Sequence, residues 1–184
     1  MNPIELRDIL DGCKKGDRMC QKALYRHFYN YGMNVCNRYC KTSIEAEEIF
    51  NDAFLKILTK ISQYNIELPF SAWMHTILIR SAINYLKKYR NRLLYSDVEN
   101  EELIDSGVLS NSAISSLSYE ELVSLIQSLP LSYRTAFNLA VIEGYSHSEI
   151  AGMLGITEGT SRSNLMVARK KLQFLITQQN LIRI

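Results

Sequence analysis

The apolar residues of this chain recur every three or four positions, the spacing that places side chains on one face of an α-helix. The repeat is clearest from Ile44 to Ile61 and predicts an amphipathic helix with Ile44 on its apolar face. Thr42 and Glu45 have the spacing of a capping box at the start of this helix. Because alternation with a period of two is nearly absent, we predict an all-α protein.

Two further helices are expected beside this one. Residues 20–40 are rich in Tyr and Phe, and residues 70–92 are first aromatic and then basic. A stretch from Ser62 to Pro69 separates the last two helices, because the proline disfavours helix at Leu68. The pattern predicts a first domain of three or four helices.

Residues 93–117 combine acidic residues with Ser, Asn and Gly and have little periodicity. Such a composition favours a flexible linker over a packed element. The sequence therefore predicts two small helical domains, residues 1–92 and 118–184.

The helical pattern resumes near Leu117 and is interrupted at Leu129 and Pro130. It returns over residues 132–143, and Gly144 then supplies the residue type that commonly follows a helix end.

The next segment has the pattern of a helix-turn-helix. Ser146 and Glu149 form a capping box for a short helix over residues 147–154, which a glycine ends. Thr157 is a candidate N-cap for a long helix over residues 158–175. A short helix, a tight turn and a second helix are the parts of a motif that enters the DNA major groove.

The residue types suit that motif. A small internal core is expected from Ile150, Ala151, Leu154, Ile156, Leu165 and Ala168. We expect the polar residues of the second helix to face outward: Glu158, Thr160, Ser161, Arg162, Asn164 and Arg169. Arg and Asn pair with guanine and adenine edges, while Ser and Thr suit phosphates. Two packed helices with a polar outer face remain the simpler alternative.

Charge is segregated along the chain although the net charge is only +2. Residues 71–96 carry five basic and no acidic residues, and residues 161–184 carry the same numbers. Between them, residues 97–121 carry seven acidic and no basic residues. Two basic zones of this kind suit phosphate contacts.

Several classes of protein are disfavoured. No apolar run reaches the ~18 to 20 residues that cross a bilayer, so we expect a cytoplasmic protein. Cys13, Cys20, Cys36 and Cys40 contain no CxxC pair and are expected to be reduced and mostly packed, with no metal and no cofactor. There is no Gly-rich phosphate loop, nucleophile elbow or HExxH motif, so no enzyme is predicted.

Both halves resemble one family. LPLSYRTAFNLAVIEGYSHSEIAGMLGITEGTSRSNLMVARKKL, residues 129–172, is similar to region 4 of sigma-70 factors, which in that family reads the promoter's minus-35 element. EAEEIFNDAFLKIL, residues 45–58, resembles region 2.2, and FSAWMHTILIRSAINYLKKYR, residues 70–90, resembles regions 2.3 and 2.4. Two regions joined by a short linker are typical of the extracytoplasmic-function type.

The resemblance implies roles for residues of the first domain. Core polymerase would contact Glu45, Glu47, Glu48, Asn51 and Asp52. The minus-10 element would be opened and held by Tyr64, Asn65, Trp73, Arg80, Asn84, Lys87, Lys88, Arg90 and Arg92. Trp73 is equally suited to the core. Arg80 and Asn84 stand where the family often has Asn and Asp, so the promoter sequence does not carry over.

In the second domain, Arg162 and Ser163 match DNA-facing positions of the family. Together with outward-facing polar residues of the same helix, the predicted minus-35 contacts are Thr160, Ser161, Arg162, Ser163, Asn164 and Arg169. Asn164 and Val167 replace residues that are frequently basic in the family, so fewer phosphate contacts are expected.

The resemblance also implies partners. These are core RNA polymerase, through the clamp helices of its largest subunit and the flap of its second-largest subunit, and promoter DNA. An anti-sigma factor, often membrane-anchored, is a further expectation, and no small-molecule substrate is expected. The alternative is a stand-alone helix-turn-helix regulator with a sensing or dimerising first domain. A helical adaptor that binds only protein would leave the basic zones without a role.

Overall fold

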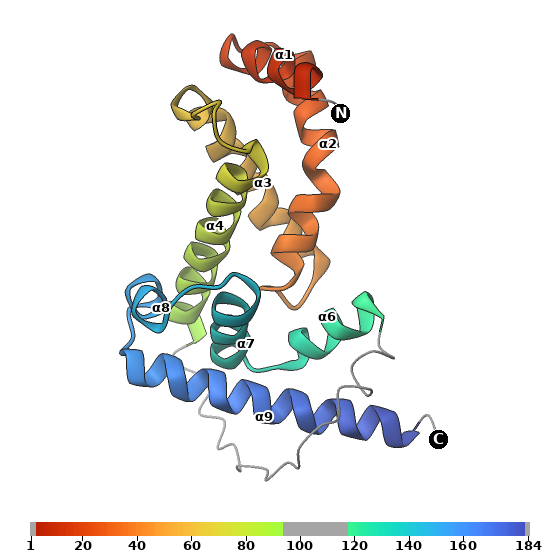
Figure 1. Cartoon of the computed structure of the whole chain (residues 1–184), viewed down its shortest axis with the longest axis vertical. Helices are drawn as coiled ribbons and strands as arrows, with labels where there is room; N and C mark the ends of the chain where they lie inside the picture. The colour runs from red at the N-terminus through yellow and green to blue at the C-terminus, as the bar shows by residue number, and fades with distance from the viewer. Residues whose placement is uncertain (1–2, 94–117, 183–184) are drawn as a thin grey trace. The chain divides into compact units, whose positions relative to one another are not determined.

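The computed structural model describes residues 3–93 and 118–182, and every regular element within them is a helix (Figure 1). The chain divides into two compact units, Met1–Tyr89 and Arg90–Ile184, which are described separately below. The prediction of an all-α fold with two small helical domains is confirmed. The linker predicted over residues 93–117 lies, apart from its first residue, outside the described residues.

Unit 1 is a helical bundle in which α2, α3 and α4 lie side by side and α1 packs against α2 (Figure 1). A single 3₁₀ turn, η1, extends α3 before the loop predicted at residues 62–69. The helices α3 and α4 begin and end within one or two residues of their predicted bounds. The elements are α1 (Pro3–Lys14), α2 (Arg18–Asn37), α3 (Ser43–Lys60), η1 (Ile61–Gln63) and α4 (Phe70–Leu93).

The start of α3 is fixed by the predicted capping box. The backbone N–H of Glu45 donates to Thr42 Oγ1 at 3.2 Å, and the Glu45 carboxylate accepts from the backbone N–H of Thr42 at 3.2 Å. These bonds satisfy two donors that a helix leaves unpaired at its N-terminus, so they fix the residue at which α3 begins.

The core of unit 1 is aromatic where α2 meets α3. The ring of Phe50 is fully buried and lies 5.3 Å from the Tyr25 ring and 5.4 Å from the Tyr29 ring, measured between centroids. A Cβ atom added to Gly32 would come within 2.2 Å of the Phe50 ring. The two helices can therefore pack closely at Gly32, because this residue has no side chain to meet the Phe50 ring.

The cysteines of unit 1 are reduced, and Cys13, Cys36 and Cys40 are buried. Burial raises the pKa of the Cys36 thiol to about 12 and that of Cys13 to about 11, which disfavours the reactive thiolate. Among the described residues, no three Cys, His, Asp or Glu side chains are grouped so that they could hold a metal ion. The described part of the chain also has no helix long and apolar enough to cross a membrane.

Unit 2 is arranged along its longest helix, α9, against which α6, α7 and α8 all pack (Figure 1). Its core is an apolar stripe of α9 covered by α6 and by side chains of α7. The Arg134 guanidinium is buried and donates to the Gln127 carbonyl at 2.9 Å, which ties α7 to the end of α6. The elements are α6 (Tyr119–Ser128), α7 (Leu131–Phe137), η2 (Asn138–Ile142), α8 (His147–Leu154) and α9 (Glu158–Ile182).

Two predicted helices of unit 2 differ from the structure. The single helix expected over residues 132–143 is α7 followed by a π-helical turn, in which the N–H of Glu143 bonds to the Asn138 carbonyl at 2.9 Å. The helix expected to end at residue 175 continues to Ile182. Ile176 extends the buried stripe one turn beyond Leu172, and this burial stabilises the additional turn.

The break between α8 and α9 was predicted correctly. Gly155 has a φ of 69°, the left-handed conformation that favours glycine, and it ends α8. Gly144, with a φ of 77°, marks the end of η2 in the same way.

Substitution of Gly32 tests the contact on which unit 1 is built. Gly32→Ala places a methyl group against the buried Phe50 ring, so the free energy of unfolding should fall by about 1–3 kcal/mol. Asn34→Ala, at an exposed position of the same helix, should leave it unchanged or slightly raised. Chemical denaturation followed by circular dichroism measures both, and equal stability of the two variants would contradict the close approach.

Candidate protein-binding and nucleic-acid-binding surfaces

One side of α3 carries most of the residues expected to bind polymerase. We call it the α3 face, and it consists of the exposed residues Ile44, Glu47, Glu48, Asn51, Asp52 and Leu55. Glu45 differs from the other predicted contacts because it is half-buried and its carboxylate closes the capping box.

Groups from both neighbouring helices hold the polar side chains of the α3 face. Asp52 pairs with Lys56, whose ammonium also donates to the buried Ser81 hydroxyl of α4 at 3.2 Å. Three tyrosine hydroxyls from α2 and α4 also donate to this face: Tyr25 to Asn51 at 2.9 Å, Tyr29 to Glu47 at 3.5 Å, and Tyr85 to Glu48 at 3.4 Å. The position of these acceptors therefore depends on the packing of all three helices.

Two apolar side chains accompany the acidic ones. Ile44 is 79% exposed and Leu55 is 66% exposed. The prediction that Ile44 lies on the apolar face of the helix is wrong, because it lies one turn from Glu48 on the outer side. The sequence indicated this position, because the spacing of residues 44, 48, 51 and 55 places all four on one side of a helix. A surface that mixes apolar and acidic groups suits a protein partner with basic residues.

The loop before α4 packs its tyrosine into an aromatic cluster. The Tyr64 ring lies 5.3 Å from the Phe70 ring and 5.4 Å from the Trp73 ring, and its hydroxyl donates to the Leu68 carbonyl. Partial burial raises the pKa of that hydroxyl. Trp73 is half-buried, so one part of its ring packs on this cluster while another part reaches the surface.

Asn65 is exposed, and its side-chain oxygen accepts from the backbone N–H of Glu67 at 3.0 Å. This is the hydrogen bond of an Asx-turn, which shapes the loop from within.

A basic side of α4 follows the aromatic cluster. Arg80, Asn84, Lys87 and Lys88 are exposed, and the spacing of residues 80, 84, 87 and 88 places them on one side of the helix. Arg90 and Arg92 belong to the last turns of α4, and their side chains lie outside the described part of the chain.

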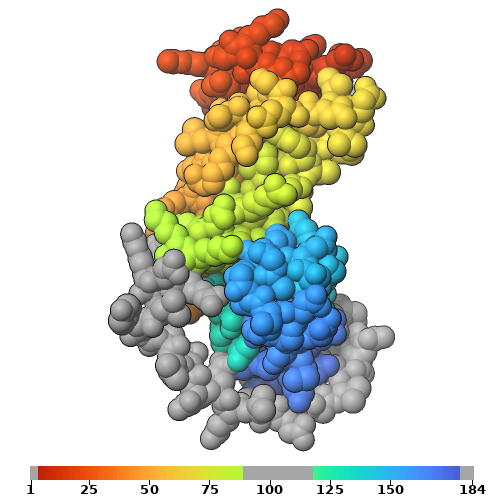
Figure 2. All heavy atoms as spheres, turned by 90° about the vertical axis from the view of Figure 1, so that its left-hand side faces the viewer, coloured from red at the N-terminus to blue at the C-terminus, as the bar shows by residue number. Residues whose placement is uncertain are grey.

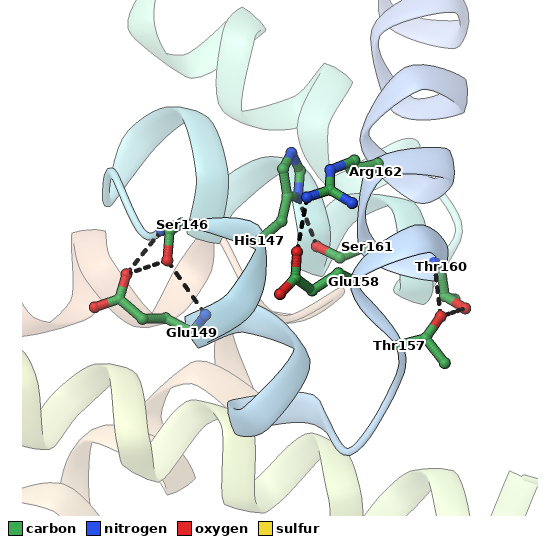
Figure 3. Close-up of polar contacts among 8 residues, drawn as sticks. All are labelled: Ser146, His147, Glu149, Thr157, Glu158, Thr160, Ser161 and Arg162. Carbon is green, nitrogen blue, oxygen red and sulfur yellow. Dashed lines mark hydrogen bonds and ion pairs between the residues drawn. The ribbon is translucent and has the colours of Figure 1, made fainter.

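The helix-turn-helix of unit 2 is held by the predicted caps (Figure 3). The Ser146 hydroxyl accepts from the backbone N–H of Glu149 at 3.3 Å. The Glu149 carboxylate in turn accepts from the Ser146 hydroxyl at 2.7 Å and from the Ser146 backbone N–H at 2.8 Å, and these two bonds lower the pKa of Glu149. At the start of α9, the N–H of Thr160 donates to Thr157 Oγ1 at 3.0 Å. Figure 2 shows α8 and the first turns of α9 as one continuous blue surface.

Ser161 does not face outward, contrary to the prediction. Its side chain is 0% exposed, and its hydroxyl forms a hydrogen bond with His147 Nδ1 at 2.9 Å (Figure 3). It lies four and seven residues before Leu165 and Ala168, which are also buried, so it belongs to the packed side of α9. The bond joins the first turn of α8 to the first turn of α9.

The other predicted residues of α9 are distributed around its surface. Arg162 is exposed and pairs with Glu158 at 2.7 Å (Figure 3). Ser163 and Arg169 are exposed, Thr160 is exposed with its hydroxyl against Thr157, and Asn164 is half-buried.

The predictions missed Met166, which is 53% exposed on the same side of α9 as Arg162 and Ser163. Met166 was assigned neither to the internal core nor to the outward-facing residues, although its helical position, four residues after Arg162, indicated the outer side.

Comparison with known proteins gives the same two regions. Residues 24–92 match the family model of sigma-70 region 2, and residues 119–172 match that of sigma-70 region 4. The chain is 29% identical over 174 residues to the ECF RNA polymerase sigma-E factor of Escherichia coli strain K12, covering 89% of this chain and 90% of the relative. It is 25% identical over 174 residues to the corresponding factor of Haemophilus influenzae, covering 90% and 92%.

A solved structure has a similar fold. The sigma factor RpoE of Bartonella quintana, crystallised with the anti-sigma factor NepR, aligns with a TM-score of 0.51 and 20% identity. The alignment covers 85% of this chain and 96% of that chain.

The placement of Ser161 is tested by enlarging it. Ser161→Gln forces a longer polar side chain into a buried position and removes the bond to His147, so unit 2 should lose about 1–3 kcal/mol of stability. Ser163→Gln, two residues further on the exposed side, should change stability by less than about 0.5 kcal/mol. Thermal unfolding monitored by circular dichroism distinguishes the two variants. If Ser161→Gln leaves the stability unchanged, Ser161 is not buried and instead lies on the outer surface.

Proposed function

The chain belongs to the sigma-70 family of RNA polymerase sigma factors, in the extracytoplasmic-function type, and on that premise we propose a role for each unit. As a sigma factor it acts with RNA polymerase in transcription initiation. Residues 1–92 dock on core polymerase and act on the minus-10 element, and residues 118–184 read the minus-35 element. The observation that carries this division is that each family region has its own exposed charged surface on a separately packed unit.

The α3 face is the proposed docking surface for the clamp helices of the largest polymerase subunit. Its carboxylates at Glu47, Glu48 and Asp52 would pair with basic residues, and Ile44 and Leu55 would be buried in the contact. Glu45 supports this surface through the capping box, and Asn51 is held by Tyr25. Unit 2 would in turn contact the flap of the second-largest subunit.

The loop and α4 form the proposed minus-10 surface. Tyr64 and Trp73 offer aromatic rings for an unstacked base, and Asn65 offers an amide on the same loop. The basic side of α4 would neutralise phosphates through Arg80, Lys87 and Lys88, with Asn84 among them. Arg90 and Arg92 would continue the same basic run.

The α9 helix is the proposed minus-35 reader. Arg162, Ser163 and Arg169 lie on its exposed side, where the first turns of a recognition helix meet base edges and phosphates. Thr160 and the half-buried Asn164 lie at the borders of that side. Ser161 would not contact DNA directly but would support this surface, because its hydrogen bond to His147 fixes α9 relative to α8.

Further proposals follow from the family. The protein catalyses no reaction itself, needs no cofactor, and acts where the polymerase acts, in the cytoplasm. An anti-sigma factor is the proposed inhibitor, since the Bartonella relative was solved with one. Such an inhibitor, in some cases membrane-anchored, would mask the surfaces on α3 and α9.

Charge reversal on the α3 face tests the docking surface. Glu48→Lys combined with Asp52→Lys should weaken binding to core polymerase about tenfold or more, because two attractive contacts become repulsive. Asp8→Lys, an exposed change on α1, should bind like the wild type. Affinity for fluorescently labelled core polymerase measures the difference. Equal binding by both variants would show that the α3 face does not contact core polymerase.

Transcription in vitro tests the function as a whole. Core polymerase from the source bacterium, mixed with this protein and a pooled promoter library, should give transcripts that depend on the protein. Their aligned upstream sequences would define the minus-10 and minus-35 elements. Absence of such transcripts, together with specific DNA binding by the protein alone, would identify a stand-alone regulator instead.

A further inference from the structure

The exposed side of α9 has an apolar residue among polar and basic ones. Met166 is 53% exposed, although thioether side chains are usually placed in cores. The packed side of the helix is formed by Ser161, Leu165, Ala168 and Leu172, which are all at most 8% exposed. Met166 points away from these four residues, so it takes no part in the core of unit 2.

The neighbours of Met166 define the chemistry of this place. Arg162 lies one turn before it and Arg169 one turn after it, with Ser163 beside them, and all three are exposed. Arg162 pairs at 2.7 Å with Glu158, which lies one turn nearer the N-terminal end of α9 (Figure 3). Met166 is thus an apolar group bordered by two cations.

A major groove presents the same combination of groups. Phosphates line it, guanine offers acceptors to arginine, and thymine offers its C5-methyl as an apolar group. Met166 lies eight residues into α9, which corresponds to about 12 Å along the helix axis at 1.5 Å per residue. That distance is within the part of a recognition helix that the groove covers.

We propose that Met166 reads a thymine of the minus-35 element by packing its thioether against the C5-methyl group. This inference rests on the proposed function, because it requires α9 to enter the major groove at the minus-35 element. The flexible, polarisable side chain suits a contact with a single methyl group. Met166 is then a specificity-determining residue that favours thymine over cytosine and over uracil at one position.

The test removes the methyl group from the DNA rather than only the side chain from the protein. Each thymine of a minus-35 element defined by transcription is replaced in turn by deoxyuridine, and the affinity of the full holoenzyme is measured by competition. With the wild-type protein, one replacement should weaken binding about fourfold, the effect of one buried methyl group. Met166→Ala should weaken binding to the thymine promoter by about the same factor and respond no further to that replacement.

A matched control uses Met19 of α2, the other strongly exposed methionine among the described residues, which is 73% exposed. Met19→Ala should keep the full fourfold response to deoxyuridine. The inference is overturned if Met166→Ala keeps that response, or if no replacement affects the wild-type protein. If either of these results is found with a holoenzyme that initiates transcription normally, only the role of Met166 is contradicted. If the holoenzyme initiates at no promoter, the proposed function is contradicted as well.

Discussion

Burial of one side of α3 and of α9 limits which residues each helix offers to a partner. In α3, the buried Phe50 lies against Gly32 of α2, so the rotation of the helix about its axis is fixed by a contact that has no space for adjustment. Glu48 and Asp52 of the α3 face lie on the opposite side of the helix from Phe50, whereas Glu47 lies at the border. In α9, the stripe that continues through Leu172 and Ile176 has the same effect on the residues proposed to face DNA. Presentation of each surface is therefore a consequence of core packing.

Core packing fixes how each helix is rotated, and hydrogen bonds between helices then position individual side chains on the surfaces. Tyrosine hydroxyls from α2 and α4 meet the polar groups of the α3 face, and the Ser161 hydroxyl meets His147 across the helix-turn-helix. Each bond joins a residue on or beneath a proposed binding surface to a different helix. A substitution in the partner helix would therefore displace the surface without touching it, and the effects of such pairs should not be additive.

The proposed surfaces carry different charged groups. The α3 face would offer carboxylates to a protein, while α4 and α9 would offer basic and polar groups to DNA. A sigma factor needs both kinds of surface, because it must hold the polymerase and the promoter at the same time. The proposed DNA-binding surface also includes an acidic residue, because Glu158 pairs with the Arg162 guanidinium one turn along the helix.

The sequence by itself determined most of the helices, several of their caps and the two family regions. Thr42 with Glu45 and Ser146 with Glu149 are local signals, because each capping box is completed within four residues. The glycine turn at Gly155 is local for the same reason, since it depends only on the backbone freedom of one residue. The tertiary structure alone decided the sides on which borderline residues lie. Ile44 and Met166 are apolar and exposed, whereas Ser161 is polar and buried. The reason is that burial of each position depends on whether another helix packs over it. The continuation of α9 beyond residue 175 has the same origin, because Ile176 is buried by packing that no local pattern specifies.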